Sequence, residues 1–388
     1  MNRIIVTIVF CIGWMVCCAQ TKPVAVGAEA TNEYFPLLKG KRIAVLSNHT
    51  GMVGNEHLVD LLKRKDFNVV CIFSPEHGFR GNADAGEHVS SSMDEKTGIP
   101  ILSLYDGDTG KPSVKSMSLF DVLVFDMQDV GLRFYTYYAT MVRMMDACAE
   151  SQKKMIILDR PNPNGHYVDG RILDVKYKSG VGWLPIPVVH GMTLGELAMM
   201  VNGEKWLPEG RICDISVIKC KNYTHQTMYQ LPIPPSPNLP TMKAVYMYPS
   251  TCYFEATPVS LGRGTDKPFL VYGHPNMLSY SFSFTPRSIP GAKNPPQLNK
   301  ICYGVDLSNL SESDIWKKGV DLTYLIDAYT NLNMGDHFFR SFFEKLIGVS
   351  YVRKMIKEGC SADEIKKKWS DDVEKFKKQR APYLLYQE

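Results

Sequence analysis

The stretch that decides the fold is NVVCIFSPEHGFRG, residues 68–81, an apolar run that stops at Glu76, His77 and Arg80. Continuous apolar runs of this length, rich in β-branched residues, are typical of strands buried on both faces. Charged groups directly after such a strand lose hydration, and this cost is usually offset by a chemical role. The stretch therefore predicts a buried strand that delivers polar side chains to a site.

Three further segments repeat this pattern of an apolar run that ends in polar residues. They are KRIAVLSN (41–48) followed by His49, DVLVFD (121–126) followed by Asp129 and Arg133, and KMIILD (154–159). In an open parallel sheet, ligands bind in the crevice outside the carboxyl ends of the strands. We therefore expect the residues at these strand ends, which include Asn48, Asp126 and Asp159, to converge on one site.

The segments between the runs have the pattern of helices that connect parallel strands. EHLVDLLKRK (56–65) carries leucines at helical spacing, with Asn55 as the candidate N-cap. YYATMVRMMDACAESQ (137–152) reads as a second helix. Strands that are apolar throughout require helices on both faces. The pattern predicts an α/β fold with a Rossmann-like, doubly wound, mostly parallel sheet from about residue 21 to 232.

A proline-rich segment, LPIPPSPNLP (231–240), marks the predicted end of that domain. Its five prolines exclude a helix or a central strand, so the segment should be an extended connection. Beyond it, residues 233–388 predict a smaller α+β domain that closes the cleft. A cluster at 248–269 in this domain contributes Glu255 and Arg263 as further site candidates.

The first twenty residues have the pattern of an export signal and not of the fold. IIVTIVFCIGWMV (4–16) is shorter than the roughly 20 apolar residues needed to span a bilayer. Cys17 and Cys18 follow it, where cleavage or lipid attachment would take place. We expect an exported, periplasmic protein with no stable membrane span. A lipid anchor at Cys17 or Cys18 is the second interpretation, and an uncleaved membrane anchor is the third.

Composition excludes several classes of protein. At 388 residues, 45% hydrophobic and 22% charged, the chain is neither disordered nor fibrous and is long enough for two domains. A net charge of +4 is too small to argue for a nucleic-acid partner. Beyond the signal the cysteines are scattered without a C-x-x-C, so they predict neither a disulfide framework nor a zinc site. One isolated disulfide stays open.

The motifs of common cofactor and nucleophile sites are missing. The turn after the first strand reads HTGMVG (49–54) and not G-x-G-x-x-G, so nicotinamide chemistry is not indicated. Neither a Gly-x-Ser-x-Gly elbow nor a Walker sequence is present. Histidines could meet Asp126 or Asp159 around a cation, but no pair has diagnostic ligand spacing. These histidines are His49, His77, His88 and His190. We expect no cofactor and no metal, with a metal-dependent hydrolase as an alternative.

Paired carboxylates without a metal suit glycoside hydrolysis. This reaction needs a protonated acid at the leaving oxygen and a second carboxyl group roughly 5–9.5 Å away. Apolar neighbours would raise the pKa of Glu76, which has His77 beside it, and make it the candidate acid. The competing explanation is an ion pair between Glu76 and Arg80 or Arg133. The candidates for the second carboxyl group are Asp126, Asp129 and Glu255.

An aromatic run follows the strand that ends at Asp126. Its residues Tyr135 and Tyr137 could form a wall that stacks against a sugar, although such aromatic residues also suit a core. A non-catalytic periplasmic receptor for a sugar or a muropeptide fits the same observations, because it too would place two domains around a cleft. A receptor would tolerate the loss of Glu76, whereas an enzyme would not.

Six blocks of the chain resemble the signatures of the NamZ-type exo-β-N-acetylmuramidases, a family long catalogued as a domain of unknown function. The blocks are SPEHGFRG (74–81), DMQDVGLRFYTY (126–137), LDRPNP (158–163), HGMTLGE (190–196), SPNLPT (236–241) and GRGT (262–265). The blocks occur in this order, and the resemblance as a whole runs from about residue 35 to the C-terminus. His190 and Asn238, which lie in two of these blocks, join the candidate substrate-binding residues.

The resemblance implies an exo-acting glycosidase of cell-wall recycling. Such an enzyme removes terminal β-1,4-linked N-acetylmuramic acid from the non-reducing end of peptidoglycan fragments, and Glu76 corresponds to the catalytic acid/base of the family. The chain departs from the family pattern at Glu255-Ala256-Thr257-Pro258 and at Thr265-Asp266. These departures bear on substrate preference more than on reaction class. The stereochemical outcome and the second catalytic group stay unassigned.

An arginine should distinguish this substrate from N-acetylglucosamine. N-acetylmuramic acid carries a lactyl ether whose carboxylate is ionised at neutral pH, and a guanidinium can bind it in bidentate fashion. Arg133 is the first choice because it follows the strand that ends at Asp126. Arg263 and Arg80 are the other candidates, and an ordinary salt bridge is the competing explanation for each.

Overall fold

The computed structural model describes residues 22–75, 79–80, 92–104 and 111–388. Three residues of the sequence predictions, Glu76, His77 and His88, lie outside the described residues, and so does the predicted export signal.

Within the described residues, a seven-stranded sheet has the order β5-β6-β4-β1-β7-β8-β9. Neighbouring strands pair in parallel, except that β5 runs antiparallel to β6. The strands are β1 (Ile43–Ser47), β4 (Val69–Ser74), β5 (Ser92–Met93), β6 (Pro100–Ser103), β7 (Val122–Asp126), β8 (Lys154–Leu158) and β9 (Ile215–Ile218). Taken in chain order, the parallel strands follow the 3-2-1-4-5-6 arrangement of a Rossmann sheet, which confirms the predicted fold class.

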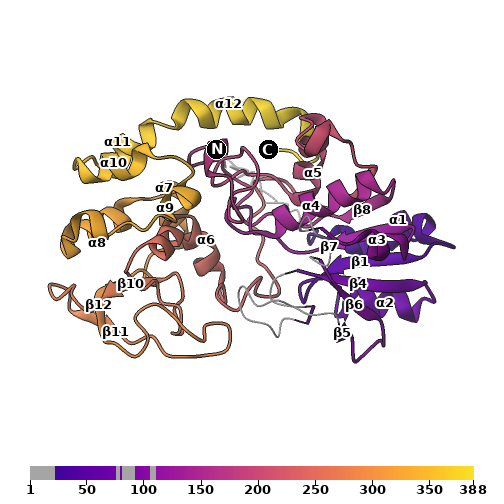
Figure 1. Cartoon of the computed structure of the whole chain (residues 1–388), viewed down its shortest axis with the longest axis horizontal. Helices are drawn as coiled ribbons and strands as arrows, with labels where there is room; N and C mark the ends of the chain where they lie inside the picture. The colour runs from indigo at the N-terminus through magenta and orange to yellow at the C-terminus, as the bar shows by residue number, and fades with distance from the viewer. Residues whose placement is uncertain (1–21, 76–78, 81–91, 105–110) are drawn as a thin grey trace, which may run out of the picture.

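Helices cover both faces of this sheet. Ala44 and Leu46 of β1 face a core that includes residues of α4 (Tyr137–Glu150) and α5 (Leu194–Gly203). Ile43 and Val45 face a core that includes residues of α1 (Thr31–Leu38) and α2 (Leu58–Arg64). Figure 1 shows the helices around the sheet at one end of the molecule. The elements of this part are η1 (Gly27–Glu29), α1 (Thr31–Leu38), β2 (Met52–Val53), β3 (Glu56–His57), α2 (Leu58–Arg64), α3 (Val114–Ser118), α4 (Tyr137–Glu150), η2 (Val175–Tyr177), α5 (Leu194–Gly203) and η3 (Pro208–Gly210).

The start of α2 differs from the sequence prediction. Strands β2 and β3 pair as a small antiparallel hairpin directly before the helix. The N-cap is His57, whose Nδ1 accepts a hydrogen bond from the backbone N–H of Val59 at 3.2 Å. The expected cap, Asn55, lies in the turn of the hairpin, so that prediction was wrong. Glu56 and His57, which local propensity would have placed in the first turn of the helix, pair as β3 of the hairpin instead.

The second part of the chain is a smaller α+β unit. Its described strands form an antiparallel sheet in the order β10-β12-β11. None of the helices in the described part of the chain is long and apolar enough to cross a membrane. The elements are α6 (Met242–Thr251), η4 (Cys252–Ala256), β10 (Val271–His274), β11 (Phe282–Phe284), β12 (Cys302–Asp306), α7 (Glu312–Lys318), α8 (Thr323–Leu332), η5 (Gly335–His337), α9 (Phe343–Ile347), α10 (Tyr351–Lys357), α11 (Ala362–Lys367), α12 (Ser370–Arg380) and η6 (Ala381–Tyr383).

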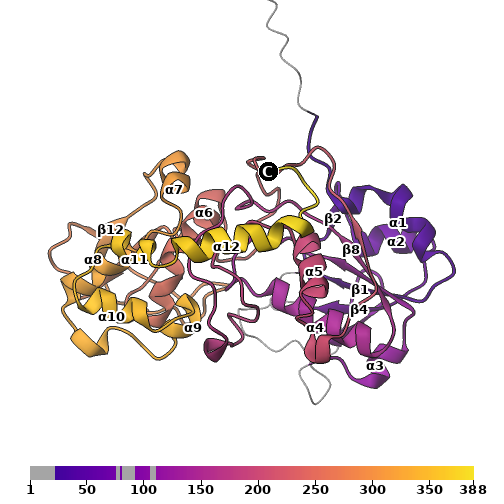
Figure 2. The same cartoon turned by 90° about the horizontal axis from the view of Figure 1, so that it is seen from above.

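The C-terminal segment returns to the first part of the chain. In Figure 2, α12 runs from the second unit to α5. Beyond it, the hydroxyl of Tyr386 donates to Oδ2 of Asp159 at 2.6 Å, and the N–H of Leu385 donates to Oε1 of Glu196 at 2.8 Å. The largest core cluster also contains residues of both parts. The two units are therefore joined by a continuous core and by the chain end.

Candidate active site

The strand ends of β1 and β7 meet at the point where the strand order reverses. Ser47 pairs with Asp126 in the parallel register, and the Ser47 hydroxyl donates to the backbone oxygen of Asp126 at 2.7 Å. The loops beyond are also tied, because the N–H of Gln128 donates to Oγ1 of Thr50 at 3.0 Å. Ligands of open α/β sheets bind at such a switch point. The structure therefore brings two of the four predicted clusters together.

Asp126 is buried and is held by an arginine. Oδ1 accepts from Nε of Arg160 at 2.6 Å, and Oδ2 accepts from an Arg160 terminal nitrogen at 3.0 Å. The same arginine donates to the backbone oxygen of Met52 at 2.8 Å. A bidentate pair of this kind neutralises the carboxylate and fixes its position. The geometry therefore gives Asp126 a role in anchoring the loop and no support for direct catalysis.

Arg160 is a residue that the sequence reasoning did not select for the site. It directly follows Asp159 at the end of β8, and that position was the available signal. It lines a cavity of about 230 Å³ at the carboxyl edge of the sheet, together with Thr50, Gln128 and Tyr229. The cavity is lined by residues of the loops after β1, β7 and β8. The end of β8 therefore joins those of β1 and β7 at the predicted common site.

Asp129 has the chemical properties of a proton donor or acceptor. Its side chain is buried, and burial raises the pKa of Asp129 to about 7. Oδ2 accepts from the N–H of Gly131 at 2.6 Å, whereas Oδ1 has no hydrogen-bond partner among the described residues. Gly131 has a positive φ of 76°, and a Cβ there would lie 2.2 Å from Oδ1 of Asn162. A glycine is therefore required to hold this carboxyl group in place.

The tyrosines of the predicted aromatic wall are packed inside the protein. Tyr135 is 8% exposed and Tyr137 is 2% exposed, with ring centroids 4.8 Å apart. The Tyr135 hydroxyl donates to the backbone oxygen of Pro235 at 2.7 Å. This geometry gives little ring face to a sugar. The expected stacking role therefore has no support, and Tyr135 instead fastens the proline-rich segment.

His49 and Asn238 also hold the connection between the two units. Nε2 of His49 lies 3.0 Å from the backbone oxygen of Pro234. The side-chain amide of Asn238 donates to the backbone oxygen of Gly291 at 2.8 Å. Together with the Tyr135 hydrogen bond, these contacts hold the proline-rich segment at the carboxyl edge of the sheet.

Arg133 is fully buried and binds backbone oxygens. Its guanidinium donates to Arg171 at 2.5 Å, to Ile186 at 2.9 Å and to Leu346 at 2.8 Å. Burial lowers the pKa of Arg133 to about 10. Because its guanidinium is enclosed and engaged, the geometry argues against our first choice for reading a lactyl carboxylate. Arg133 instead ties the first unit to the C-terminus of α9.

The two other candidate arginines are already paired with carboxylates. Arg80 bridges Asp94 at 2.8 Å and Asp60 at 3.1 Å. Arg263 pairs with Glu255 at 2.5 Å, and their side chains are 22% and 25% exposed. Of the three candidates, Arg263 keeps partial exposure with a single carboxylate partner.

A chain of aromatic contacts links the Arg263–Glu255 pair to the loop that follows β7. The guanidinium carbon of Arg263 is 5.1 Å from the centroid of Phe269, which contacts Tyr248 at 4.6 Å. The ring of Tyr248 in turn lies 6.4 Å from that of Tyr135. This chain of rings connects the second unit to the carboxyl edge of the sheet.

Asp159 and His190 are interior residues with structural partners. Asp159 accepts from the Thr193 hydroxyl at 2.7 Å, the Gly195 N–H at 2.9 Å and the Tyr386 hydroxyl, while burial raises its pKa to about 6. Nδ1 of His190 accepts from the N–H of Met192 at 3.2 Å, and burial lowers its pKa to about 3. These partners give both residues a structural role, while Nε2 of His190 has no hydrogen-bond partner among the described residues.

Asn48 combines full burial with an unused donor. Its Oδ1 accepts from the Thr50 N–H at 3.0 Å and from the Thr50 hydroxyl at 2.6 Å. Its Nδ2 has no hydrogen-bond partner among the described residues. A buried amide of this kind is a candidate to donate to a ligand or to a neighbouring carboxyl group.

Two family models match consecutive parts of the chain. The model for the N-terminal part of exo-beta-N-acetylmuramidase NamZ matches residues 43–243, and the model for the C-terminal part matches residues 246–386. The chain belongs to the NamZ exo-β-N-acetylmuramidase family. This finding confirms the resemblance that the six sequence blocks indicated.

Individual NamZ relatives match along most of their length. Peptidoglycan beta-N-acetylmuramidase NamZ from Bacillus subtilis (strain 168) is 38% identical over 379 residues, which cover 91% of this chain and 89% of that protein. A crystal structure of a DUF1343 family protein from Bacteroides fragilis NCTC 9343 has a TM-score of 0.89 at 70% identity, covering 95% of this chain and all of that one. Another from the same organism has a TM-score of 0.77 at 29% identity, covering 94% and 99%.

The catalytic glutamate implied by the NamZ resemblance, Glu76, lies outside the described residues, as does His77. The strand that leads to it is described, and β4 ends at Ser74 as the sequence predicts. Leu46 pairs with Phe73, so one register step further places Ser74 beside Ser47. The described end of β4 therefore lies beside the end of β1, next to Asn48.

Proposed function

We propose that this protein is an exo-acting glycoside hydrolase that releases terminal β-1,4-linked N-acetylmuramic acid from the non-reducing end of peptidoglycan fragments. The observation that carries the proposal is family membership along the whole fold, with a curated relative that is named a peptidoglycan β-N-acetylmuramidase. The Rossmann order of the sheet also supports the proposal, because ligands of such sheets bind at the switch point, here between β1 and β7, and Asp129 follows β7.

The proposed mechanism assigns Glu76 as the general acid and Asp129 as the second carboxyl group. Hydrolysis requires a proton for the leaving oxygen and a carboxylate that activates water or attacks the sugar. Asp126 is engaged by Arg160 and Glu255 by Arg263, whereas Asp129 keeps one oxygen unpaired among the described residues. A pKa of about 7 lets Asp129 exchange a proton near neutral pH.

Recognition of the lactyl carboxylate falls to Arg263 in this proposal. The second unit carries it toward the carboxyl edge through the contacts of Tyr248, and its guanidinium is not enclosed as that of Arg133 is. An incoming carboxylate would share or replace Glu255 as its partner. The buried donor of Asn48 is the candidate for a further contact with the substrate.

The proposed site of action is outside the cytoplasm. The apolar run at 4–16 and the cysteines at its end support export to the periplasm, with Cys17 or Cys18 as the position of a lipid anchor if one is added. Peptidoglycan fragments are the proposed partners, and no nucleic acid is expected.

A pair of chromogenic substrates tests the function directly. The purified protein should hydrolyse a β-N-acetylmuramide and should be poor on the matching β-N-acetylglucosaminide, which lacks the lactyl group. Glu76→Gln should lose about 10²–10⁴-fold in turnover because a positioned acid contributes that much. Glu95→Gln, an exposed glutamate, is the matched control and should keep full activity. Binding of the muramide without turnover by the parent protein would indicate the receptor instead, and full activity of Glu76→Gln would remove Glu76 from the mechanism.

A further inference from the structure

A second cavity lies at the opposite edge of the sheet from the candidate active site. It has a volume of about 800 Å³ and is formed by α1, the loop that precedes β1 and the loop that precedes β4. The N–H of Ile43 at the start of β1 donates to Asn68 in that second loop. Because β1 has five residues of roughly 3.3 Å each, roughly 16 Å of strand separates this cavity from the carboxyl edge. The cavity is therefore a separate site, of a size that suits a small ligand.

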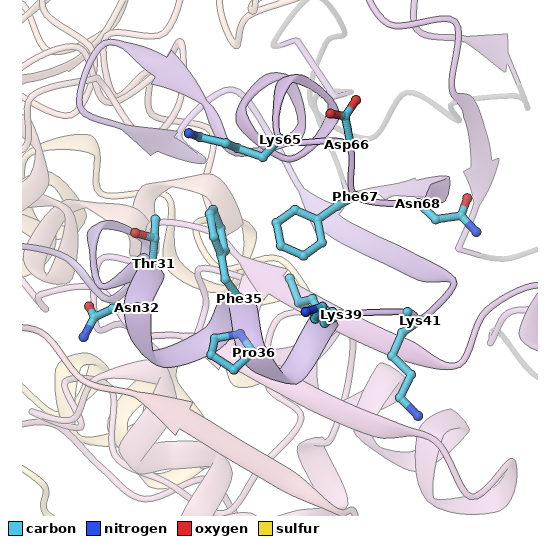
Figure 3. Close-up of a pocket in the computed structure, with 12 residues that line it drawn as sticks. Thr31, Asn32, Phe35, Pro36, Lys39, Lys41, Lys65, Asp66, Phe67 and Asn68 are labelled. Carbon is cyan, nitrogen blue, oxygen red and sulfur yellow. The ribbon is translucent and has the colours of Figure 1, made fainter.

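Two aromatic rings form the centre of the cavity. The centroids of Phe35 and Phe67 lie 4.7 Å apart at an interplanar angle of 61°, and both side chains are half-buried. Phe35 also contacts Tyr34 edge-on at 5.0 Å. In Figure 3 the two rings lie beside each other between the helix and the loop. Packing against the core fixes their positions, and the remaining ring surface can contact the C–H face of a sugar.

Three lysines surround the rings. Lys39, Lys41 and Lys65 are exposed, and none has an ion-pair partner among the described residues. Lys41 and Lys65 extend on opposite sides of the aromatic pair in Figure 3. The lining residues carry three positive charges against the single carboxylate of Asp66, so the cavity is net positive. Unpaired cations around a concavity attract an anionic ligand.

We propose that this cavity is a non-catalytic binding site for an N-acetylmuramic acid unit within a glycan strand whose lactyl carboxylate is free. The sugar ring contacts Phe35 and Phe67, and the carboxylate meets the lysines. The assignment of this ligand rests on the proposed function, which supplies an acidic amino sugar as the substrate class. A strand held here keeps the enzyme near further chain ends after each product is released, because the next encounter occurs at a high effective concentration.

The test compares binding with hydrolysis in the full-length protein. Lys39→Glu/Lys41→Glu/Lys65→Glu reverses the charge of the cavity at exposed positions that have no described ion pairs. The control, Lys367→Glu/Lys368→Glu/Lys378→Glu, makes the same change in net charge on exposed lysines of the C-terminal helices. Binding is measured on ice with peptide-free cell-wall glycan strands, and turnover is measured with the chromogenic muramide.

The cavity variant should bind the strands at least about tenfold more weakly at low salt, while the control variant matches the parent. About 0.5 M salt should remove the difference, because exposed charges are then screened. Both variants should keep the parent kcat/KM on the muramide. Phe67→Leu keeps an apolar side chain and removes the ring, so it should weaken strand binding severalfold. Its thermal stability should fall less than that of a variant with a polar side chain at this position.

Three results would overturn the proposal. The first is undiminished strand binding by the cavity variant, and the second is equal binding of the parent to uncharged chitin oligomers. The third is a cavity variant that loses binding to phosphatidylglycerol vesicles but still binds the glycan strands as the parent does, which would make the cavity a lipid contact. The muramide assay separates this inference from the proposed function. If the parent does not hydrolyse the muramide but its strand binding depends on the three lysines, only the proposed function is refuted. If the parent hydrolyses the muramide normally but its strand binding does not depend on the lysines, only the cavity site is refuted.

Discussion

Replacing Asp129 with asparagine keeps the shape of the side chain and removes its ionisation. Burial raises the pKa of Asp129 to about 7 from its ordinary value of 3.8. The folded protein therefore holds this proton to a higher pH than the unfolded chain does. The stability that the group contributes is complete below pH 3.8 and is lost as the pH rises through about 7. At about 1.36 kcal/mol per pKa unit, the loss between about pH 5 and about pH 8 is about 2.5 kcal/mol.

Asparagine can still accept the hydrogen bond from Gly131 and has no proton to lose. The free energy of unfolding of Asp129→Asn, relative to the parent, should therefore rise by about 2.5 kcal/mol from about pH 5 to about pH 8. Urea denaturation at both pH values measures this difference. Muramide turnover by the variant should fall by about 10²-fold or more if Asp129 transfers a proton in the reaction.

Asp121→Asn is the matched control for this experiment. A hydrogen bond from the Arg42 guanidinium lowers the pKa of Asp121 to about 2, so its contribution is present above pH 3.8 and is lost only as the pH falls through about 2. Its effect on stability should therefore be constant between about pH 5 and about pH 8. A difference for Asp129→Asn that is equally constant would refute the argument that this carboxyl group is protonated by burial. Full turnover would remove Asp129 from the mechanism but leave the stability argument intact.

Three further changes have separate expected outcomes. Arg133→Met should lower the free energy of unfolding by about 3 kcal/mol or more, because three buried carbonyl oxygens lose their donor. Urea denaturation measures this loss, and the preference for the muramide over the glucosaminide should not change. Arg263→Ala should lower kcat/KM on the muramide by roughly tenfold to a hundredfold and hardly change the low rate on the glucosaminide; an equal loss on both substrates would contradict a role in reading the carboxylate. Tyr386→Phe should cost about 1–3 kcal/mol of stability, seen as a lower midpoint in urea, because Asp159 loses a buried hydrogen bond; an unchanged midpoint would show that the chain end does not stabilise the sheet.

Local pattern was sufficient for the strands and for their common edge. The apolar runs that end at Asn48, Ser74, Asp126 and Asp159 correspond to β1, β4, β7 and β8, because buried parallel strands need side chains that are apolar on both faces. The family followed from six blocks in order, each too short to be specific alone. These features are set by neighbours in the chain, and so the sequence by itself determined them.

Partners across the fold were decided only by the tertiary structure. Arg133 meets the backbone oxygen of Leu346, 213 residues away, and Asp159 meets Tyr386, 227 residues away. Such contacts depend on how the C-terminal helices return to the sheet, which no local periodicity encodes. The same holds for Asp126, whose charge is neutralised by Arg160 from the neighbouring strand end. Residue type and position in the chain thus identified the charged groups. Burial and distant partners then separated the buried, structural Arg133 from the partly exposed Arg263, and among the candidate second carboxyl groups they left Asp129 as the buried one with an oxygen that has no described partner.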